Sequence, residues 1–334
     1  MFAGNISVAF RRAAAVGLAV SVLAIAGLAG NTAVAAEKIT YLFPAPPFLP
    51  AFGPIQLAQG KGYYKAAGLD VVFAVGKGGV DVAKQVGTGN AQLGGILADG
   101  PILVRQNGVP IKAVASFGGR GFMQLVVRKD LNIKKAIDLK GKTISVMSFQ
   151  DTTFYALLGV LASAGLTRDD VNIQAAGPSG TWKLLAAGKV QGMAGVPDWI
   201  PPVLQSGLEI DIIPSDRFFP TMAQAIGVSD KYIKDRPDVV RGFVRASLKG
   251  MKDIIDNPSA AAAEFATIVP RWKGKEGYIK AVFNYYADLV YPGQKRLGEI
   301  DGARMSKLQD FYLKSKIIRK KSPLNELFTN EFIE

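Results

Sequence analysis

The chain has 334 residues, with 40 lysines and arginines against 27 acidic residues, which gives a formal net charge of +13 at neutral pH. It contains no cysteine, so disulfides, thiolate metal sites, a cysteine nucleophile and a lipid-anchored amino-terminal cysteine are excluded. It also contains no histidine, which disfavours most hydrolytic and metal-dependent chemistries, because histidine is the commonest general base and zinc ligand.

The amino terminus has the three-part layout of a secretory signal peptide. Arg11 and Arg12 precede an uncharged apolar stretch at 13–29, and a small-residue run follows. A membrane-spanning helix is the competing interpretation, but the stretch is only marginally long enough. We expect cleavage after Ala35 or Ala36, which leaves a freely soluble periplasmic protein. The general secretory route is the default, and the paired arginines leave a twin-arginine route open.

Strand-like and helix-like segments then alternate, an order typical of an α/β protein with largely parallel sheets. Strands are predicted at 39–43, 69–75, 93–97, 111–117, 123–128, 143–147, 171–175, 193–196 and 209–213. After about residue 221 the pattern becomes helical, and helices are predicted at 236–256, 258–268, 277–289 and 303–316.

The densest basic cluster lies at the end of the last of these helices. It consists of Lys314, Lys316, Arg319, Lys320 and Lys321. Such a cluster invites a nucleic-acid or membrane hypothesis, but an exported chain meets little nucleic acid. We interpret the cluster as the solvated end of an amphipathic helix and expect no nucleic-acid partner.

Short motifs along the mature chain carry a family resemblance. They are 60–71 (GKGYYKAAGLDV), 85–94 (QVGTGNAQLG), 107–115 (NGVPIKAVA), 138–144 (DLKGKTI), 164–171 (AGLTRDDV), 185–192 (LAAGKVQG), 236–241 (RPDVVR) and 257–261 (NPSAA). In this order they resemble the solute-binding proteins of the nitrate, sulfonate, taurine and thiamine-pyrimidine importers. Most of them close helices or start core strands, so they indicate the fold and leave the ligand open.

The resemblance implies a two-lobed periplasmic binding protein fold of the type II kind, with a helical carboxy-terminal portion. Residues 1–36 would be the signal peptide, 37–127 and 222–334 the first lobe, and 128–221 the second. The hinge would lie near residue 128 and at 215–221. The implied partners are a small-molecule ligand and an ABC permease with its ATPase, and the implied state is a monomer without a cofactor.

In parallel α/β lobes, ligands bind beyond the carboxyl ends of the strands. This rule selects the loops 43–52, 76–79, 117–121, 148–153 and 196–199. Candidate ligand contacts on or near these loops are Phe43, Phe48, Gly78, Gly79, Asp99, Phe117, Arg120, Gln150, Thr152, Thr153, Asp198 and Trp199.

The chemistry of these candidates points to more than one ligand. The loop 43–52 has four prolines, three phenylalanines and no charge, which suits a planar ligand better than a hydrated oxyanion, although each phenylalanine could instead belong to the core. Trp199 is the preferred aromatic contact, and Trp182 is the second choice. Asp99 and Asp198 could accept N–H groups of a heterocycle.

Three further features allow two interpretations each. Arg120 could clamp a carboxylate or sulfonate, or remain a solvated loop residue. The glycine-rich turn at 76–79 could bring backbone donors to an anion, or merely require positive φ. At 149–153, Asp151 or Thr152 would cap a helix, while Thr153 or Gln150 would contact the ligand.

The expected function is therefore capture of a small planar organic solute for an ABC importer, for example a pyrimidine-like heterocycle or an aromatic acid. Binding of a sulfonate, taurine or nitrate-type oxyanion is the alternative. The fold also resembles the thiamine-pyrimidine synthase of fungi, but that family depends on an active-site histidine and a cysteine-rich iron motif. The chain has neither residue, so an enzyme is disfavoured. A sensor partner for a receptor kinase is the third possibility.

Overall fold

The computed structural model describes residues 36–334 and Met1, so the expected signal peptide lies almost wholly outside the described residues. The first five-stranded sheet has the order β2-β1-β3-β10-β4. Its strands are β1 (Glu37–Phe43), β2 (Leu69–Val75), β3 (Leu93–Leu97), β4 (Ile111–Ser116) and β10 (Gln224–Ser229). Strand β1 pairs in parallel with β2 and β3, whereas β10 runs antiparallel between β3 and β4.

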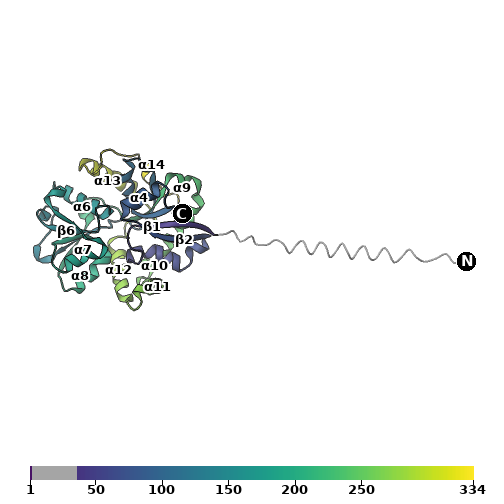
Figure 1. Cartoon of the computed structure of the whole chain (residues 1–334), viewed down its shortest axis with the longest axis horizontal. Helices are drawn as coiled ribbons and strands as arrows, with labels where there is room; N and C mark the ends of the chain where they lie inside the picture. The colour runs from purple at the N-terminus through teal and green to yellow at the C-terminus, as the bar shows by residue number, and fades with distance from the viewer. Residues whose placement is uncertain (2–35) are drawn as a thin grey trace. The chain divides into compact units, whose positions relative to one another are not determined.

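The second five-stranded sheet has the order β7-β6-β8-β5-β9. Its strands are β5 (Gln124–Arg128), β6 (Thr143–Val146), β7 (Asn172–Ala175), β8 (Gly192–Gly195) and β9 (Ile210–Pro214). Strand β6 pairs in parallel with β7 and β8, and β5 runs antiparallel to β8 and β9. Figure 1 shows the two lobes side by side, with β6 in one and β1 and β2 in the other.

Helices cover the faces of both sheets (Figure 1). In the first lobe they are α2 (Gly53–Gly60), α3 (Tyr63–Ala66), α4 (Gly79–Gly87), α5 (Gly100–Arg105), α9 (Asp230–Asp235), α10 (Pro237–Asp256), α11 (Pro258–Ile268), α13 (Gly302–Lys314) and α14 (Leu324–Leu327). In the second lobe they are α6 (Thr152–Ser163), α7 (Gly177–Ala186) and α8 (Ile200–Gln205). Helix α12 (Glu276–Leu289) packs against α11 and also against α8 of the other lobe. Among the described helices, none combines the length and apolar character that a membrane crossing needs.

Two stretches of chain join the lobes. The first lies between β4 and β5, so β5 belongs to the second sheet and this crossover comes before the expected boundary at residue 128. The second lies between β9 and β10 and includes the expected segment 215–221. Pairing with β8 and β9 on both sides fixes β5 in the second lobe, which the strand pattern alone does not reveal.

The predicted strands and carboxy-terminal helices agree with the structure to within a few residues, but β10 was not predicted. Its sequence, QAIGVS, contains a glycine and precedes a long helical region. All six residues are buried, because β10 has a neighbour on each side. A Cβ at Gly227 would lie 2.8 Å from the Ile96 side chain, so a small residue fits this central position.

Close helix packing yields a test of the first lobe. In α10, a Cβ added to Gly250 would lie 2.1 Å from the Pro54 carbonyl oxygen of α2. We expect Gly250→Ala to lower the free energy of unfolding by about 1–3 kcal/mol, because the two helix backbones must separate. Chemical denaturation followed by circular dichroism measures this change.

The matched control is Gly277→Ala in α12, where an added Cβ meets no atom within 4 Å. It should leave stability unchanged or raise it by up to ~1 kcal/mol through helix propensity. Equal effects of the two substitutions would contradict the close approach of α2 and α10.

Candidate functional site

The two lobes touch across the ends of their strands. The backbone N–H of Val80, in α4, donates to the carbonyl oxygen of Gln150, which precedes α6 (3.2 Å). Gly78 has a φ of 111°, and a Cβ there would lie 2.7 Å from the same Gln150 oxygen. The loop before α4 therefore meets the loop before α6 backbone to backbone, and the lobes are closed against each other.

A buried carboxylate makes a second connection between the lobes. Asp198 lies in the short 3-10 helix η5 (Pro197–Trp199) after β8 and is 1% exposed. Its carboxylate accepts the Ala51 backbone N–H of the first lobe (2.8 Å) and the Tyr286 hydroxyl of α12 (2.6 Å). Its backbone carbonyl accepts the Tyr278 hydroxyl (2.7 Å). Burial raises the pKa of Asp198 to about 6, and the hydrogen bonds from Tyr286 and Ala51 act against that rise.

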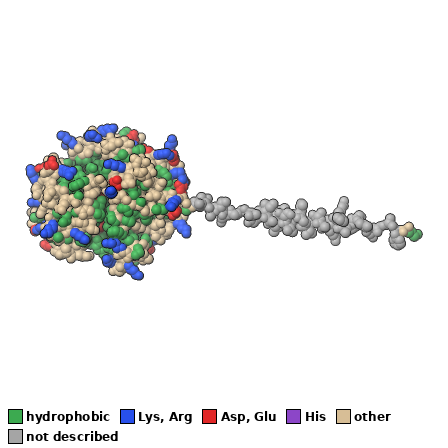
Figure 2. Space-filling view, viewed as in Figure 1, with side chains coloured by type: hydrophobic (Ala, Val, Ile, Leu, Met, Phe, Trp, Pro, Cys, Tyr) green, Lys and Arg blue, Asp and Glu red, His purple; other side chains and the backbone are tan. Residues whose placement is uncertain are grey.

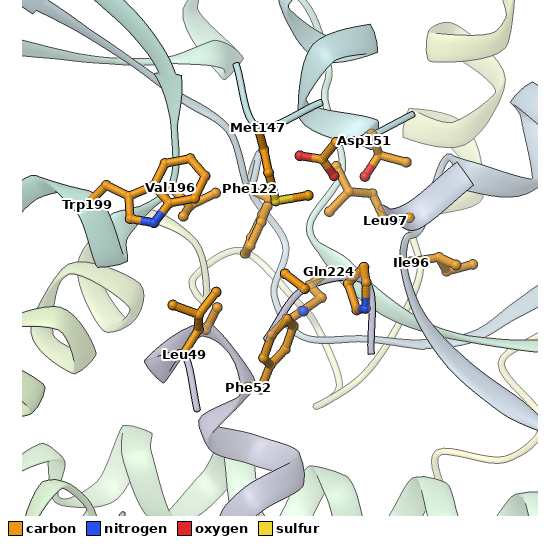
Figure 3. A pocket seen from close by; sticks show the side chains of 15 residues that line it. Leu49, Phe52, Ile96, Leu97, Phe122, Met147, Asp151, Val196, Trp199 and Gln224 are labelled. Carbon is orange, nitrogen blue, oxygen red and sulfur yellow. The ribbon is translucent and has the colours of Figure 1, made fainter. Parts of the chain in front are cut away.

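A narrow chamber lies between these two connections, and its unfilled space, counted together with the part that opens to solvent, is about 450 Å³. The first lobe contributes Pro44, Ala45, Leu49, Ala51, Phe52, Gly79, Ile96, Leu97 and Gln224, the second contributes Met147, Asp151, Thr152, Val196 and Trp199, and Phe122 comes from the first crossover. Figure 3 shows Trp199 and Val196 on one side of the chamber and Asp151 and Leu97 on the other. Most of the lining is apolar, as in a site that excludes water from its ligand.

Two buried side chains bring most of the polarity into the chamber. Asp151 is 7% exposed and stands at the N-cap position of α6, where its carboxylate accepts the Thr153 hydroxyl. Burial raises the pKa of Asp151, while the Thr153 hydroxyl and nearby backbone N–H groups oppose the rise. Gln224 begins β10 and is 5% exposed, and among the described residues its side-chain amide has no hydrogen-bond partner. Its donors and its acceptor are therefore available to a ligand.

A second cavity adjoins the chamber and shares Leu49 and Trp199 with it; its unfilled space, counted together with the part that opens to solvent, is about 890 Å³. We call it the vestibule. Its lining includes the aromatic residues Phe48, Trp182, Trp199, Trp272 and Tyr278. Trp272 and Tyr278 stack with ring centroids 5.0 Å apart, and Arg271 lies over the Phe48 ring at 4.4 Å. Figure 2 shows hydrophobic side chains gathered near the middle of the visible face, while most Lys and Arg side chains lie around its edge.

The structure brings together some of the residues selected from the sequence. Gly79, Thr152 and Trp199 line the chamber, and Phe48 and Asp198 line the vestibule together with Trp199. The carboxylate of Asp198 is already engaged by the protein, so its place in the structure is a connection between lobes.

Other candidates lie elsewhere. Phe43 and Phe117 are buried in the hydrophobic core and line neither cavity, because the strand ends turn these rings inward. Asp99 is buried against the Tyr312 hydroxyl of α13 (2.6 Å), and burial raises its pKa to about 6. Arg120 is exposed, donates to the Asp288 carbonyl oxygen (3.0 Å) and lines a separate polar cavity beside the crossovers.

The loop before α6 also differs from expectation in detail. Asp151 occupies the N-cap position of α6 and lines the chamber, whereas the Thr153 hydroxyl donates a hydrogen bond to the Asp151 carboxylate. The Gln150 side chain is exposed, and its backbone meets Val80 of the other lobe. Gly78 likewise serves the contact between the lobes and does not line the chamber.

Several lining residues were not among the ligand contacts predicted from the sequence. They are Leu49, Phe52, Ile96, Leu97, Phe122, Met147, Asp151, Val196 and Gln224. Most lie on loops that the strand-end rule selects or directly beside them, so the rule located the regions without choosing the side chains. Gln224 could not be located in this way, because β10 was not recognised. Within residues 36–334, no group of three or more acidic side chains is arranged to hold a metal ion.

Two α/β lobes joined by two crossovers, with a cavity at the facing strand ends, define the class of two-lobed periplasmic binding protein folds. The fold superposes on that of the alkanesulfonate-binding protein SsuA from Xanthomonas axonopodis pv. citri, whose structure has MOPS bound. The TM-score is 0.68 at 16% sequence identity, and the match covers 89% of this chain and 98% of SsuA.

The chain belongs to the NMT1/THI5-like family, which it matches over residues 49–261. It is 28% identical over 290 residues to the riboflavin-binding protein RibY of Chloroflexus aurantiacus, covering 84% of this chain and 82% of RibY. It is also 23% identical to the 4-amino-5-hydroxymethyl-2-methylpyrimidine phosphate synthase of Aspergillus parasiticus, covering 70% of this chain and 71% of that enzyme. The expected resemblance to this group is confirmed.

The raised pKa of Asp198 predicts a pH dependence of stability. Between about pH 4, where an aspartate titrates in an unfolded chain, and pH 6, the folded protein binds this proton more tightly. The contribution of Asp198 to the free energy of unfolding therefore falls as the pH rises through this window. As the pH rises from 4 to 7, the free energy of unfolding of the non-titrating variant Asp198→Asn should therefore increase, relative to that of wild type, by up to about 3 kcal/mol. Urea denaturation at a series of pH values measures the difference.

The control variant is Asp70→Asn, which makes the same change at an exposed position on β2. Its stability should follow the wild-type curve throughout. A constant difference between Asp198→Asn and wild type across the window would contradict the predicted titration.

Proposed function

We propose that this protein is the exported solute-binding component of an ABC importer and captures a small planar organic solute between its lobes. The observation that supports this proposal is the apolar chamber. Both lobes line it at the ends of their strands, and Trp199 and Phe52 border it. Aromatic rings beside a narrow apolar space favour a flat ligand that exchanges water for stacking contacts. A pyrimidine-like or larger heterocycle fits this description.

The relatives support the same class of ligand. RibY is named for riboflavin and the fungal synthases for a pyrimidine, and both molecules contain planar nitrogen heterocycles. We propose a binding role and no catalysis, because the chain has no histidine or cysteine to supply the chemistry expected of the synthases. The amino-terminal pattern supports a periplasmic location, where a monomer would deliver its ligand to a permease and its ATPase.

Closure links binding to delivery. A ligand that contacts Trp199 from one lobe and Phe52 from the other favours the closed form, because opening would break one set of contacts. The permease would then distinguish loaded from empty protein by the distance between the lobes. Crossovers at 117–123 and 215–223 are the proposed hinge.

The direct test is native mass spectrometry of the protein isolated from the periplasm of its own host. We expect an additional mass that corresponds to one bound small molecule per chain and disappears on denaturation. A chain that carries no ligand, and that binds none of a panel of heterocycles, aromatic acids and sulfonates, would contradict the proposed function.

Tryptophan fluorescence tests the position of the ligand identified in this way. Of the three tryptophans, only Trp199 lines the chamber. We expect the ligand to change the fluorescence of wild type and of Trp182→Phe, and most of this change to be lost in Trp199→Phe. An equal change in wild type and Trp199→Phe would contradict placement of the ligand beside Trp199.

A further inference from the structure

The chamber contains one charged side chain, and that side chain is acidic. Among its described lining residues there is no lysine or arginine, and Asp151 is the only acid. The basic groups of the loops that were candidates for anion binding lie elsewhere: Arg120 lines the cavity beside the crossovers, and Lys77 is exposed. The lining of the chamber is therefore acidic, although the net charge of the whole chain is strongly positive.

The polar groups of the chamber come from opposite lobes. Asp151 is fixed at the start of α6 by the Thr153 hydroxyl, and Gln224 is fixed by its backbone at the start of β10, where Phe117 donates to its carbonyl oxygen (2.6 Å). Both side chains are more than nine-tenths buried, and the Gln224 amide has no partner among the described residues. A single ligand lying between them can reach both lobes with polar contacts.

The surroundings decide which ligand atoms these groups accept. A carboxylate in an apolar environment loses hydration and gains most from N–H or O–H donors. An oxyanion in the same space would meet a like charge in a medium of low polarity, with no cation among the described lining residues of the chamber to balance it. Arg271 lines the vestibule and not the chamber. The glutamine amide can both donate and accept, so it matches a heterocycle edge that carries a ring nitrogen or carbonyl beside an N–H group.

We propose that Asp151 determines the ligand class: the chamber accepts a neutral or cationic planar heterocycle that presents an N–H donor to Asp151 and a mixed edge to Gln224, and it rejects oxyanions. This inference rests on the proposed solute-binding function and narrows it. It separates this protein from a binder of sulfonates, nitrate or aromatic acids that has the same fold.

Isothermal titration of the exported protein tests the proposal with six named probes. Cytosine, adenine and lumichrome are planar and carry N–H donors, whereas benzoate, ethanesulfonate and nitrate are anions. We expect at least one of the heterocycles to bind and none of the anions to bind as tightly. Tighter binding of any anion would overturn the inference and leave the solute-binding function standing. Failure of all six to bind would count against both.

Substitution of Asp151 separates selectivity from stability. Asp151→Asn keeps the shape and an oxygen that can accept the Thr153 hydroxyl but removes the charge. It should therefore weaken binding of the heterocycle roughly 10- to 100-fold and reduce the ratio of heterocycle affinity to anion affinity. The control is Asp169→Asn, the same change at an exposed position where the side chain has no hydrogen-bond partner among the described residues. It should alter neither the affinity for the heterocycle nor the selectivity over the anions. Gln224→Leu should lower the affinity for the heterocycle without raising the affinity for the anions. Unchanged selectivity in Asp151→Asn would overturn the assignment.

Discussion

The buried carboxylate of Asp198 is the interaction on which the geometry of the binding region depends. It joins the end of β8 to the Ala51 backbone of the opposite lobe and to Tyr286 of α12. Its neighbour Trp199 and the Ala51–Phe52 segment form facing walls of the chamber. Because a buried carboxylate is costly unless its hydrogen bonds are satisfied, these walls are held at one separation while the lobes are closed. The chamber is therefore defined by a polar contact outside it.

The chamber divides its tasks between apolar and polar residues. Leucine, isoleucine, phenylalanine and methionine side chains exclude water, and they define the shape of a ligand rather than its identity. Asp151 and Gln224 are few but buried: the Asp151 carboxylate accepts the Thr153 hydroxyl, and the Gln224 amide has no partner among the described residues. In the proposed binding role, buried polar groups of this kind discriminate between ligands that do and do not match them. The adjoining vestibule adds aromatic surface with room for a larger ligand to extend outward.

Most of the fold could be predicted from the sequence, because alternating strand and helix patterns and the glycine-closed motifs carry it. The exception is β10: all six of its residues are buried, so no alternation of apolar and polar residues marks it, and only its pairing with β3 and β4 reveals it. At the site, the strand-end rule located the loops, but it could not tell that Phe43 turns into the core while Phe52 faces the chamber. The direction of a side chain within an irregular loop depends on distant packing partners. For the same reason Asp151 could be recognised as a helix cap but not as a chamber residue.

The lobes also meet at a place where side chains take no part: the Val80 N–H and the Gln150 carbonyl, beside the Cβ-free Gly78. A contact made by the main chain alone does not change when neighbouring residues mutate, provided that the glycine is kept. The chamber lining can consequently change through substitution while the main-chain contact between the two lobes is retained. A new cargo can then evolve without a new mechanism of closing.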